Sequence, residues 1–255
     1  EDRFTARPSA MLSVLPSYTQ LGMAALLPHQ SLAFADDGLV EVDGNPSAGT
    51  ENRSRVLTSA GGTAIQANDL FSMKRSETRE LLKSHQLLYV YHNQIDNTGD
   101  KQATESDTFR ACEVAIEELV RLVKKLANAN VNNVLITADH GFLYQESRLE
   151  GQDYLSVKPH GDTLLHVNHR FALGRGLKRD PAFITFSSQQ LQMAGDIEAQ
   201  VPASIHRIRT TGSGARFVHG GASLQEVVIP VITINKGRSS DIYKTPVKIV
   251  TETDK

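Results

Sequence analysis

Cysteine, tryptophan and long apolar runs are scarce or missing in this chain, and each absence excludes a class of protein. The sequence has 255 residues, a single cysteine (Cys112) and no tryptophan. One thiol excludes an internal disulfide and a cysteine-based zinc site. No stretch of about 18 consecutive apolar residues is present, and the opening Glu1-Asp-Arg-Phe is unlike a signal peptide. We therefore predict a cytoplasmic protein without a membrane segment.

A strong charge of either sign is also missing. The formal net charge is -2 at pH 7, which argues against a strongly basic nucleic-acid-binding surface. Residues 158–216 are locally basic, and we interpret them as a cap-like insertion. Their charges either hold a phosphodiester backbone or a substrate phosphate, or form a solvated rim. The basic side chains and histidines of this segment are Lys158, His160, His166, His169, Arg170, Arg175, Lys178, Arg179, His206, Arg207, Arg209 and Arg216.

The most informative stretch that is present runs from Val134 to Phe142. Its apolar and β-branched residues predict a strand buried on both faces, and Asp139, His140 and Gly141 follow it. Open parallel sheets bind their ligands at this carboxyl end of the strands. A carboxylate oxygen and an imidazole nitrogen suit zinc or manganese. By itself, however, an Asp-His pair is more often a cap or a surface turn.

Two further places in the chain carry groups of the same kind, one of them at a second strand end. The strand-like run Leu87–Tyr91 is followed by Asp96 and Asp100, which one helical turn or a compact loop can aim at one point. A solvated turn is the alternative explanation. Late in the chain His219 precedes two glycines, and Ser223 to Glu226 forms a capping box before a predicted strand at 227–234.

A hydroxyl group lies where a nucleophile would be expected. Residues 18–27 contain good helix formers and end at Pro28, which places Thr19 in the first turn of a helix. There the helix dipole and free backbone N–H groups favour an alkoxide and a bound phosphate oxygen. Ser17 or Thr19 could equally be a simple N-cap.

Two other segments have distinct patterns. Residues 104–128 carry apolar side chains at helical spacing, with Cys112 as a packing residue among them. Residues 36–63 are rich in glycine and polar residues, and hairpin-like turns occur at 35–38 and 43–44. We expect an irregular excursion from the core sheet there. The length and the 40% hydrophobic content are enough for one α/β domain with a full core.

Four blocks spread over most of the chain resemble the PglZ family, the alkaline-phosphatase-superfamily component of bacterial BREX phage-resistance systems. The blocks are residues 15–28, 89–100, 136–144 and 217–226, and they contain the candidate metal ligands and hydroxyl groups described above. The resemblance implies one catalytic domain over residues 1–255. Its expected fold is an α/β, three-layer sandwich with a mainly parallel central sheet and helices on both faces.

The resemblance also implies two divalent metal ions, zinc or alternatively manganese, beside a Ser or Thr nucleophile. One ion would be bound by Asp96, Asp100 and His219, and the other by Asp139 and His140. Many members of the superfamily have a histidine where this chain has Asp100, so this ligand departs from the common pattern. The implied nucleophile is Thr19, with Ser17 as the alternative.

The implied activity is metal-dependent hydrolysis of a phosphoester, in phage defence together with other BREX proteins. A phosphodiester is the favoured substrate, which includes nucleic acid. A second hypothesis is a metal-binding scaffold in a defence complex, whose catalysis is vestigial. A sulfatase-like hydrolase is disfavoured because that chemistry uses an oxidised Cys or Ser in a different local motif.

One ligand of the superfamily has no counterpart in this sequence. The superfamily's first metal-binding Asp ends a core strand that lies well before the nucleophile. Eighteen residues precede Thr19 here, and none of Glu1, Asp2 and Arg3 reads as the end of a buried strand. We therefore expect the chain to lack its first core strand and one ligand, and to have little activity by itself.

Overall fold

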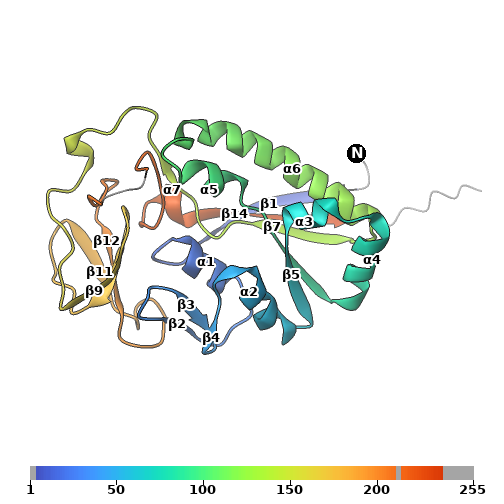
Figure 1. Cartoon of the computed structure of the whole chain (residues 1–255), viewed down its shortest axis with the longest axis horizontal. Helices are drawn as coiled ribbons and strands as arrows, with labels where there is room; N and C mark the ends of the chain where they lie inside the picture. Colours follow the sequence, from blue (N-terminus) through green and yellow to red (C-terminus); the bar gives the residue numbers. More distant parts are fainter. Residues whose placement is uncertain (1–3, 211–213, 238–255) are drawn as a thin grey trace, which may run out of the picture.

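A three-stranded sheet runs through the middle of the molecule (Figure 1). The computed structural model describes residues 4–210 and 214–237, so that Glu1, Asp2 and Arg3 lie outside the described residues. In this sheet β14 (Val228–Lys236) lies between β1 (Phe4–Leu12) and β7 (Asn133–Thr137) and is antiparallel to both. Helices lie on both sides of this sheet in Figure 1, α5 and α6 on one side and α1 and α2 on the other.

A second, two-stranded sheet is parallel. It pairs β5 (Gly62–Gln66) with β6 (Leu87–Tyr91), and the chain between them contains α3 (Ala67–Ser72) and α4 (Arg75–Ser84). Among the described strands this is the one parallel pair, so the expected mainly parallel central sheet is not confirmed. The reason is the direction of β14, which separates β1 from β7 and runs against both.

The long helix predicted at 104–128 is present and covers the sheets. It begins with the 3-10 turn η1 (Glu105–Asp107) and continues as α6 (Thr108–Asn128). Its buried Leu122 and Leu126 pack with Leu70 of α3, and partly buried side chains of β6 and β7 join this cluster. The helix therefore covers strands of both sheets. Cys112 is partly buried on it, as a packing residue would be.

Residues 32–58 are more regular than we expected. The two predicted turns are present, with φ of 78° at Gly38 and 75° at Gly44, and they connect the small antiparallel strands β2 (Leu32–Phe34), β3 (Val40–Val42) and β4 (Asn45–Pro46). The prediction of an irregular excursion is wrong for the part that follows, which is the ten-residue helix α2 (Gly49–Thr58). One face of this helix contacts solvent, so most of its residues are polar. Its few apolar residues do not show the helical spacing by which a helix is recognised in the sequence.

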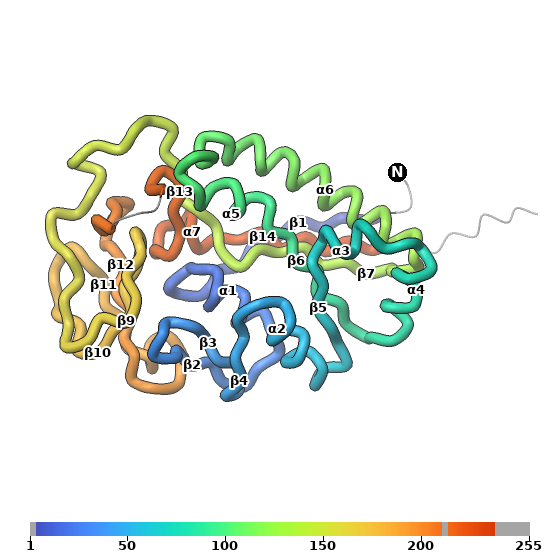
Figure 2. The backbone as a smooth tube through the Cα atoms, in the orientation of Figure 1, coloured from blue at the N-terminus to red at the C-terminus, as the bar shows by residue number. Residues whose placement is uncertain are grey.

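The basic segment 158–216 contains a separate antiparallel sheet of four strands, in the order β11-β12-β10-β9. The strands are β9 (Thr163–Val167), β10 (Ala172–Arg175), β11 (Phe183–Phe186) and β12 (Glu198–Pro202). Figure 2 shows the chain leaving the central sheet after β7, forming this sheet at one end of the molecule, and returning at β13 (Phe217–Val218) and α7 (Leu224–Val227). The short elements β8 (Leu143–Tyr144) and η2 (Gly151–Asp153) lie on the outgoing path.

The positive charges of this segment do not all form a solvated rim. Arg170 is 0% exposed and Arg207 is 3% exposed. The exposed side chain of Arg175 pairs with Asp36 and Asp196. These arginines therefore stabilise the fold. Within the described residues, no helix has the length and apolar character needed to cross a bilayer.

Candidate metal centre

Four separate parts of the chain bring the predicted site residues to one place. Thr19 is the first residue of α1 (Thr19–Ala25), in the first turn as expected. Asp96 lies in α5 (Gln94–Gly99) and Asp100 follows that helix directly. Asp139 and His140 follow β7, and His219 follows β13. The strand ends and the helix start thus converge, although they are up to 200 residues apart in sequence (219 - 19 = 200).

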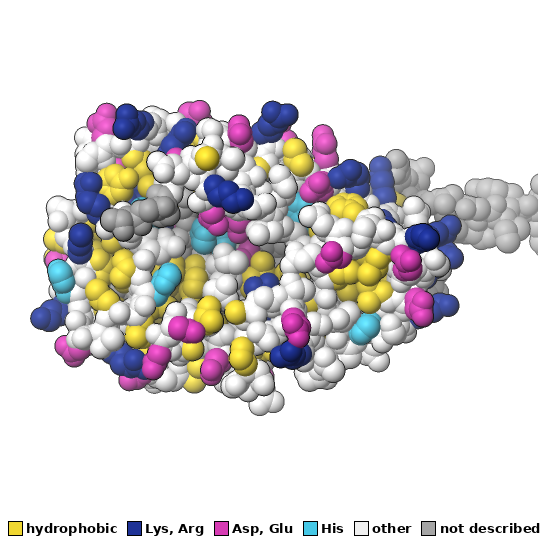
Figure 3. Space-filling view, viewed as in Figure 1, with side chains coloured by type: hydrophobic (Ala, Val, Ile, Leu, Met, Phe, Trp, Pro, Cys, Tyr) yellow, Lys and Arg dark blue, Asp and Glu magenta, His cyan; other side chains and the backbone are white. Residues whose placement is uncertain are grey.

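Asp96, Asp139 and His140 form a compact group of potential ligands. One ligand atom from each lies within 4.8 Å of the others. The His140 Nε2 atom is 3.6 Å from Asp96 Oδ2 and 3.4 Å from Asp139 Oδ2. Figure 3 shows acidic and histidine side chains meeting on the wall of a hollow in this face of the molecule. Two carboxylates and an imidazole at such distances match the oxygen and nitrogen ligands of zinc or manganese.

Thr19 lies within hydrogen-bond distance of this group. Its Oγ1 is 3.0 Å from His140 Nε2, while His140 Nδ1 is 2.9 Å from the carbonyl oxygen of Gly141. A carbonyl only accepts hydrogen bonds, so Nδ1 carries a proton, and in the neutral form of the ring Nε2 has the free lone pair. Thr19 can donate to that lone pair, and a metal ion could use the same lone pair.

His219 and Asp100 form a pair beside the group. The ring of His219 stacks on that of His140, with centroids 3.9 Å apart and an angle of 7° between the planes. The His219 Nε2 atom is 3.7 Å from Asp100 Oδ1. The structure therefore groups Asp96 with Asp139 and His140, whereas the family resemblance assigned Asp96 to the ion held by His219 and Asp100.

Two buried polar atoms show that the site fits a divalent cation. Asp139 Oδ2 and His219 Nδ1 are buried and have no hydrogen-bond partner among the described residues. Such atoms are rare in folded proteins unless a water or an ion satisfies them. Burial raises the pKa of Asp96. Burial alone would lower the pKa of His219, but the carboxylates of Asp100, Asp96 and Asp139 raise it above its ordinary value. The centre is thus a partly buried group of carboxylates and imidazoles.

The backbone around Asp139 is held by close packing from two helices. A Cβ atom on Gly22 of α1 would collide with the carbonyl oxygen of Asp139, so only glycine allows this approach. The Ser13 hydroxyl donates to the same carbonyl oxygen. On the other side the Gly141 N–H donates to the Glu226 carbonyl at 2.8 Å. These contacts fix the backbone that carries the Asp139 carboxylate and the His140 ring.

A buried ion pair that sequence reasoning missed holds the loop of His219. The Arg170 guanidinium donates to both carboxylate oxygens of Glu226 at 2.8 and 2.9 Å, and the Gly221 N–H also donates to Glu226 at 2.8 Å. Burial alone would raise the pKa of Glu226, but these hydrogen bonds hold it below its ordinary value. The sequence showed Glu226 only as a helix cap, because nothing local connects it with a residue 56 positions away.

Ser17 has a structural contact that separates it from Thr19. Its side chain is 0% exposed, and its hydroxyl donates to the Gly221 carbonyl oxygen at 2.6 Å. This hydrogen bond ties the start of α1 to the loop that carries His219.

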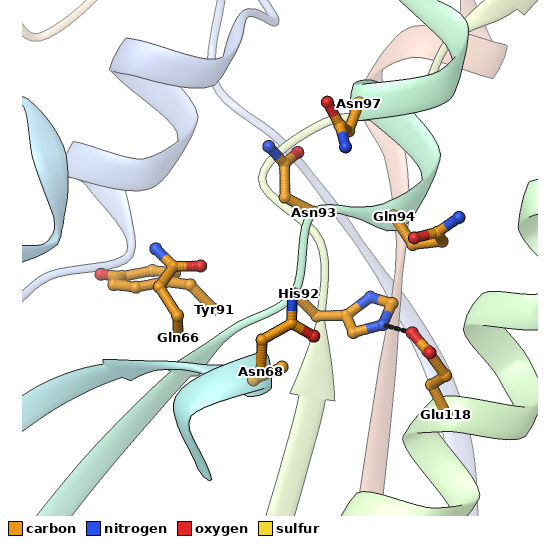
Figure 4. A pocket seen from close by; sticks show the side chains of 9 residues that line it. Gln66, Asn68, Tyr91, His92, Asn93, Gln94, Asn97 and Glu118 are labelled. Carbon is orange, nitrogen blue, oxygen red and sulfur yellow. Dashed lines mark hydrogen bonds and ion pairs between the residues drawn. The ribbon is translucent and has the colours of Figure 1, made fainter. Parts of the chain in front are cut away.

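A polar cavity of about 90 Å³ adjoins the centre at the carboxyl ends of β5 and β6 (Figure 4). His92 Nε2 is 2.7 Å from Glu118 Oε2 on one wall. Most of the other lining groups are carboxamides, which both donate and accept hydrogen bonds. They are Gln66, Asn68, Asn93, Gln94 and Asn97, and Tyr91 completes the wall beside Gln66.

Comparisons with known proteins place this geometry in a family. The chain is 40% identical over 252 residues to the alkaline phosphatase-like protein BrxZ of Escherichia coli O9:H4 (strain HS), and covers 29% of that protein. It is 37% identical over 254 residues to the alkaline phosphatase-like protein PglZ of Bacillus cereus (strain H3081.97), covering 30% of it. Both alignments include 96% of this chain.

A solved structure shares the fold at low identity. Murine ectonucleotide pyrophosphatase/phosphodiesterase 5 matches 88% of this chain and 78% of its own length, with a TM-score of 0.52 and 14% identity. The family model of the BREX system PglZ alkaline phosphatase-like domain matches residues 1–234. The predicted resemblance is thereby confirmed. The chain belongs to the BREX system PglZ alkaline phosphatase-like domain family, and it spans less than a third of the length of the curated relatives it matches.

Proposed function

We propose that this domain is a metal-dependent phosphoester hydrolase with Thr19 as its nucleophile. The observation that carries the proposal is the 3.0 Å separation of Thr19 Oγ1 from His140 Nε2, within the group that Asp96 and Asp139 complete. A hydroxyl beside a set of hard and borderline ligands is the arrangement expected of a metal-activated nucleophile. Ser17 is less suited, because its hydroxyl is buried and hydrogen-bonded to a backbone carbonyl.

The chain's own residues divide the chemistry between them. Thr19 Oγ1 gives up its proton and bonds to phosphorus, while the bond from phosphorus to the leaving oxygen breaks and that oxygen takes up a proton. Water then attacks phosphorus, and the Thr19 oxygen leaves and regains a proton. Asp96, Asp139 and His140 would hold a divalent ion, with Asp100 and His219 beside them. When bound, such an ion lowers the pKa of the hydroxyl and offsets the charge on the phosphoryl oxygens.

The setting of this activity is part of the proposal. The relatives are named as alkaline phosphatase-like proteins and the family as a BREX system domain. We propose that the domain acts in phage defence together with other BREX proteins. Phosphodiesters, nucleic acid included, are the proposed substrates, and zinc or manganese the proposed metal.

Substitutions of the nucleophile and of a ligand should fail differently, which tests the proposal. Thr19→Ala should leave zinc affinity nearly unchanged while turnover of a chromogenic phosphodiester falls by orders of magnitude, and Thr19→Ser should retain part of the activity. His219→Ala should lose zinc affinity as well as turnover. Ser17→Ala should lower thermal stability, since it removes a buried hydrogen bond worth about 1 kcal/mol, with a smaller effect on turnover.

Two results would contradict the proposal. Wild-type rates in the Thr19→Ala protein would assign the attack to Ser17 or to a water molecule. Stoichiometric zinc binding without hydrolysis of any phosphoester, even in the full-length protein, would favour the alternative function, a metal-binding scaffold in a defence complex.

A further inference from the structure

Arg53 is a buried cation that lacks a carboxylate partner in the described part of the chain. It lies on α2 with 7% exposure. Its Nε donates to the Ser47 carbonyl oxygen at 3.0 Å, which fixes the stem of the side chain. No carboxylate oxygen of the described residues lies within 4.0 Å of its nitrogens. Arg170, by contrast, is buried, and its guanidinium donates hydrogen bonds to the Glu226 carboxylate and to backbone carbonyl oxygens.

An unpaired buried charge is unfavourable unless something compensates it. Among the described residues the terminal Nη groups of Arg53 donate no hydrogen bond to a carboxylate or carbonyl oxygen, and the Tyr91 hydroxyl is the polar side-chain group beside its guanidinium. The guanidinium therefore presents unused donors, in a planar fork whose geometry matches two oxygens of a carboxylate or phosphate.

Tyr91 connects Arg53 to the candidate metal centre. The guanidinium carbon of Arg53 lies 4.8 Å from the centre of the Tyr91 ring. Tyr91 is the last residue of β6, and its buried hydroxyl has no hydrogen-bond partner among the described residues. Burial raises the pKa of Tyr91 to about 12, although the neighbouring charge of Arg53 opposes this shift, and the charge of Asp139 adds a smaller contribution in the same direction as burial. The hydroxyl is thus a neutral donor near the carboxylate of Asp139.

We propose that Arg53 and Tyr91 form a phosphoryl-binding pair at the edge of the metal centre, which holds oxygens of the substrate that are not transferred to water. The pair rests on the proposed function, because it assumes that a phosphoester lies beside Thr19. Arg53 contributes the charge, and both residues contribute donors that are otherwise unused. A phosphoryl group bound here would supply the missing counter-charge of Arg53, and its remaining oxygens would face the ligands of the ion.

The test measures binding of inorganic phosphate to the zinc-loaded protein by calorimetry. Arg53→Lys keeps the positive charge but removes the planar guanidinium. Tyr91→Phe keeps the aromatic ring but removes the hydroxyl donor. Each should weaken phosphate binding by about tenfold or more, while the affinity for zinc alone stays unchanged. Arg55→Ala is the matched control, because this arginine lies on the same helix, is exposed and pairs with Glu51. It should bind phosphate as the wild type does.

The outcomes separate this inference from the proposed function. Equal phosphate affinity in wild type, Arg53→Lys and Tyr91→Phe would overturn the pair, even if the wild type hydrolyses phosphodiesters. No phosphate binding by the zinc-loaded wild type would overturn it as well. Phosphate binding that depends on Arg53, in a protein without hydrolytic activity, would support the pair while contradicting the proposed function. The lysine substitution is used because it keeps a charged side chain of similar length at this buried position, whereas Arg53→Ala would prevent folding.

Discussion

Some side chains of this domain lie in positions that destabilise the fold but suit the binding of a cation. Asp139 has a buried carboxylate oxygen without a hydrogen-bond partner in the described structure, and Asp96 lies beside it. Like charges at short range repel, and an unsatisfied buried acceptor is destabilising. Strain of this kind is expected where a cation completes the site.

The first prediction follows from that conflict. Asp139→Asn should stabilise the metal-free protein, or leave its stability unchanged, because a buried negative charge is removed. It should also abolish most of the stabilisation by zinc, since a ligand is lost. Thermal unfolding with a chelator and with excess zinc measures both effects. Asp107→Asn is the control, because Asp107 is exposed and makes no capping hydrogen bond. The same zinc-induced rise in Tm for wild type and Asp139→Asn would show that Asp139 does not bind the ion.

Whole elements decide how closely the groups of the candidate metal centre approach one another. The helix α1 carries Thr19 at its first position and Gly22 one turn later, and Gly22 packs against the backbone of Asp139. This contact determines the distance between α1 and the end of β7. It thereby sets the position of the Thr19 hydroxyl relative to the ligands.

Gly22→Ala offers a test in which two effects have opposite signs. Alanine favours a helix over glycine by about 1 kcal/mol, so propensity alone predicts a more stable protein. The collision with Asp139 predicts instead a loss of about 1–3 kcal/mol, as in overpacked cores, together with weaker zinc binding. Urea unfolding and zinc titration measure both. Gly151→Ala is the control, because a Cβ there meets nothing within 4 Å. A Gly22→Ala protein that is more stable than wild type would refute the close contact.

At the scale of the whole molecule, the parallel pair and the central sheet remain separate in the described structure. Among the described residues β6 pairs only with β5 and β7 only with β14, yet side chains of both strands pack in the same cluster under α6. Large apolar side chains of the central sheet are exposed, including Leu12 of β1 at 71% and Leu135 of β7 at 63%. Unpaired strand edges and exposed apolar groups are typical of a surface that another segment covers. We propose that a core strand from a longer form of the protein, with one further carboxylate, joins this domain.

This proposal predicts how length affects activity. The chain alone should bind at most one divalent ion tightly and hydrolyse phosphodiesters far more slowly than a form of the full length of its longer relatives. Metal analysis after dialysis and turnover at saturating zinc and manganese measure the two quantities. Equal turnover in the two forms would show that no additional strand or ligand is needed.

Sequence patterns indicated the local parts of the site and the family. A strand running into Asp139 and His140, a helix starting at Thr19 and a capping box at Ser223 are encoded by neighbouring residues, whose periodicity and capping preferences act over a few positions. The long helix α6 was predicted for the same reason. The polar helix α2 was missed, and the direction of β14 against its neighbours was not foreseen, because strand direction depends on the path of the whole chain.

The sequence by itself determined which side chains are available for the chemistry, and its motifs were sufficient to identify the family. Only the tertiary structure decided which of them meet. Thr19 and His140 are 121 positions apart, and Arg170 and Glu226 are 56 apart. Arg53 attracted no notice in the sequence, because an arginine on a polar helix is normally solvated. Its burial beside Tyr91 results from the packing of α2 against the parallel strands. Contacts of this kind depend on how distant segments pack together, and no local pattern of residues encodes them.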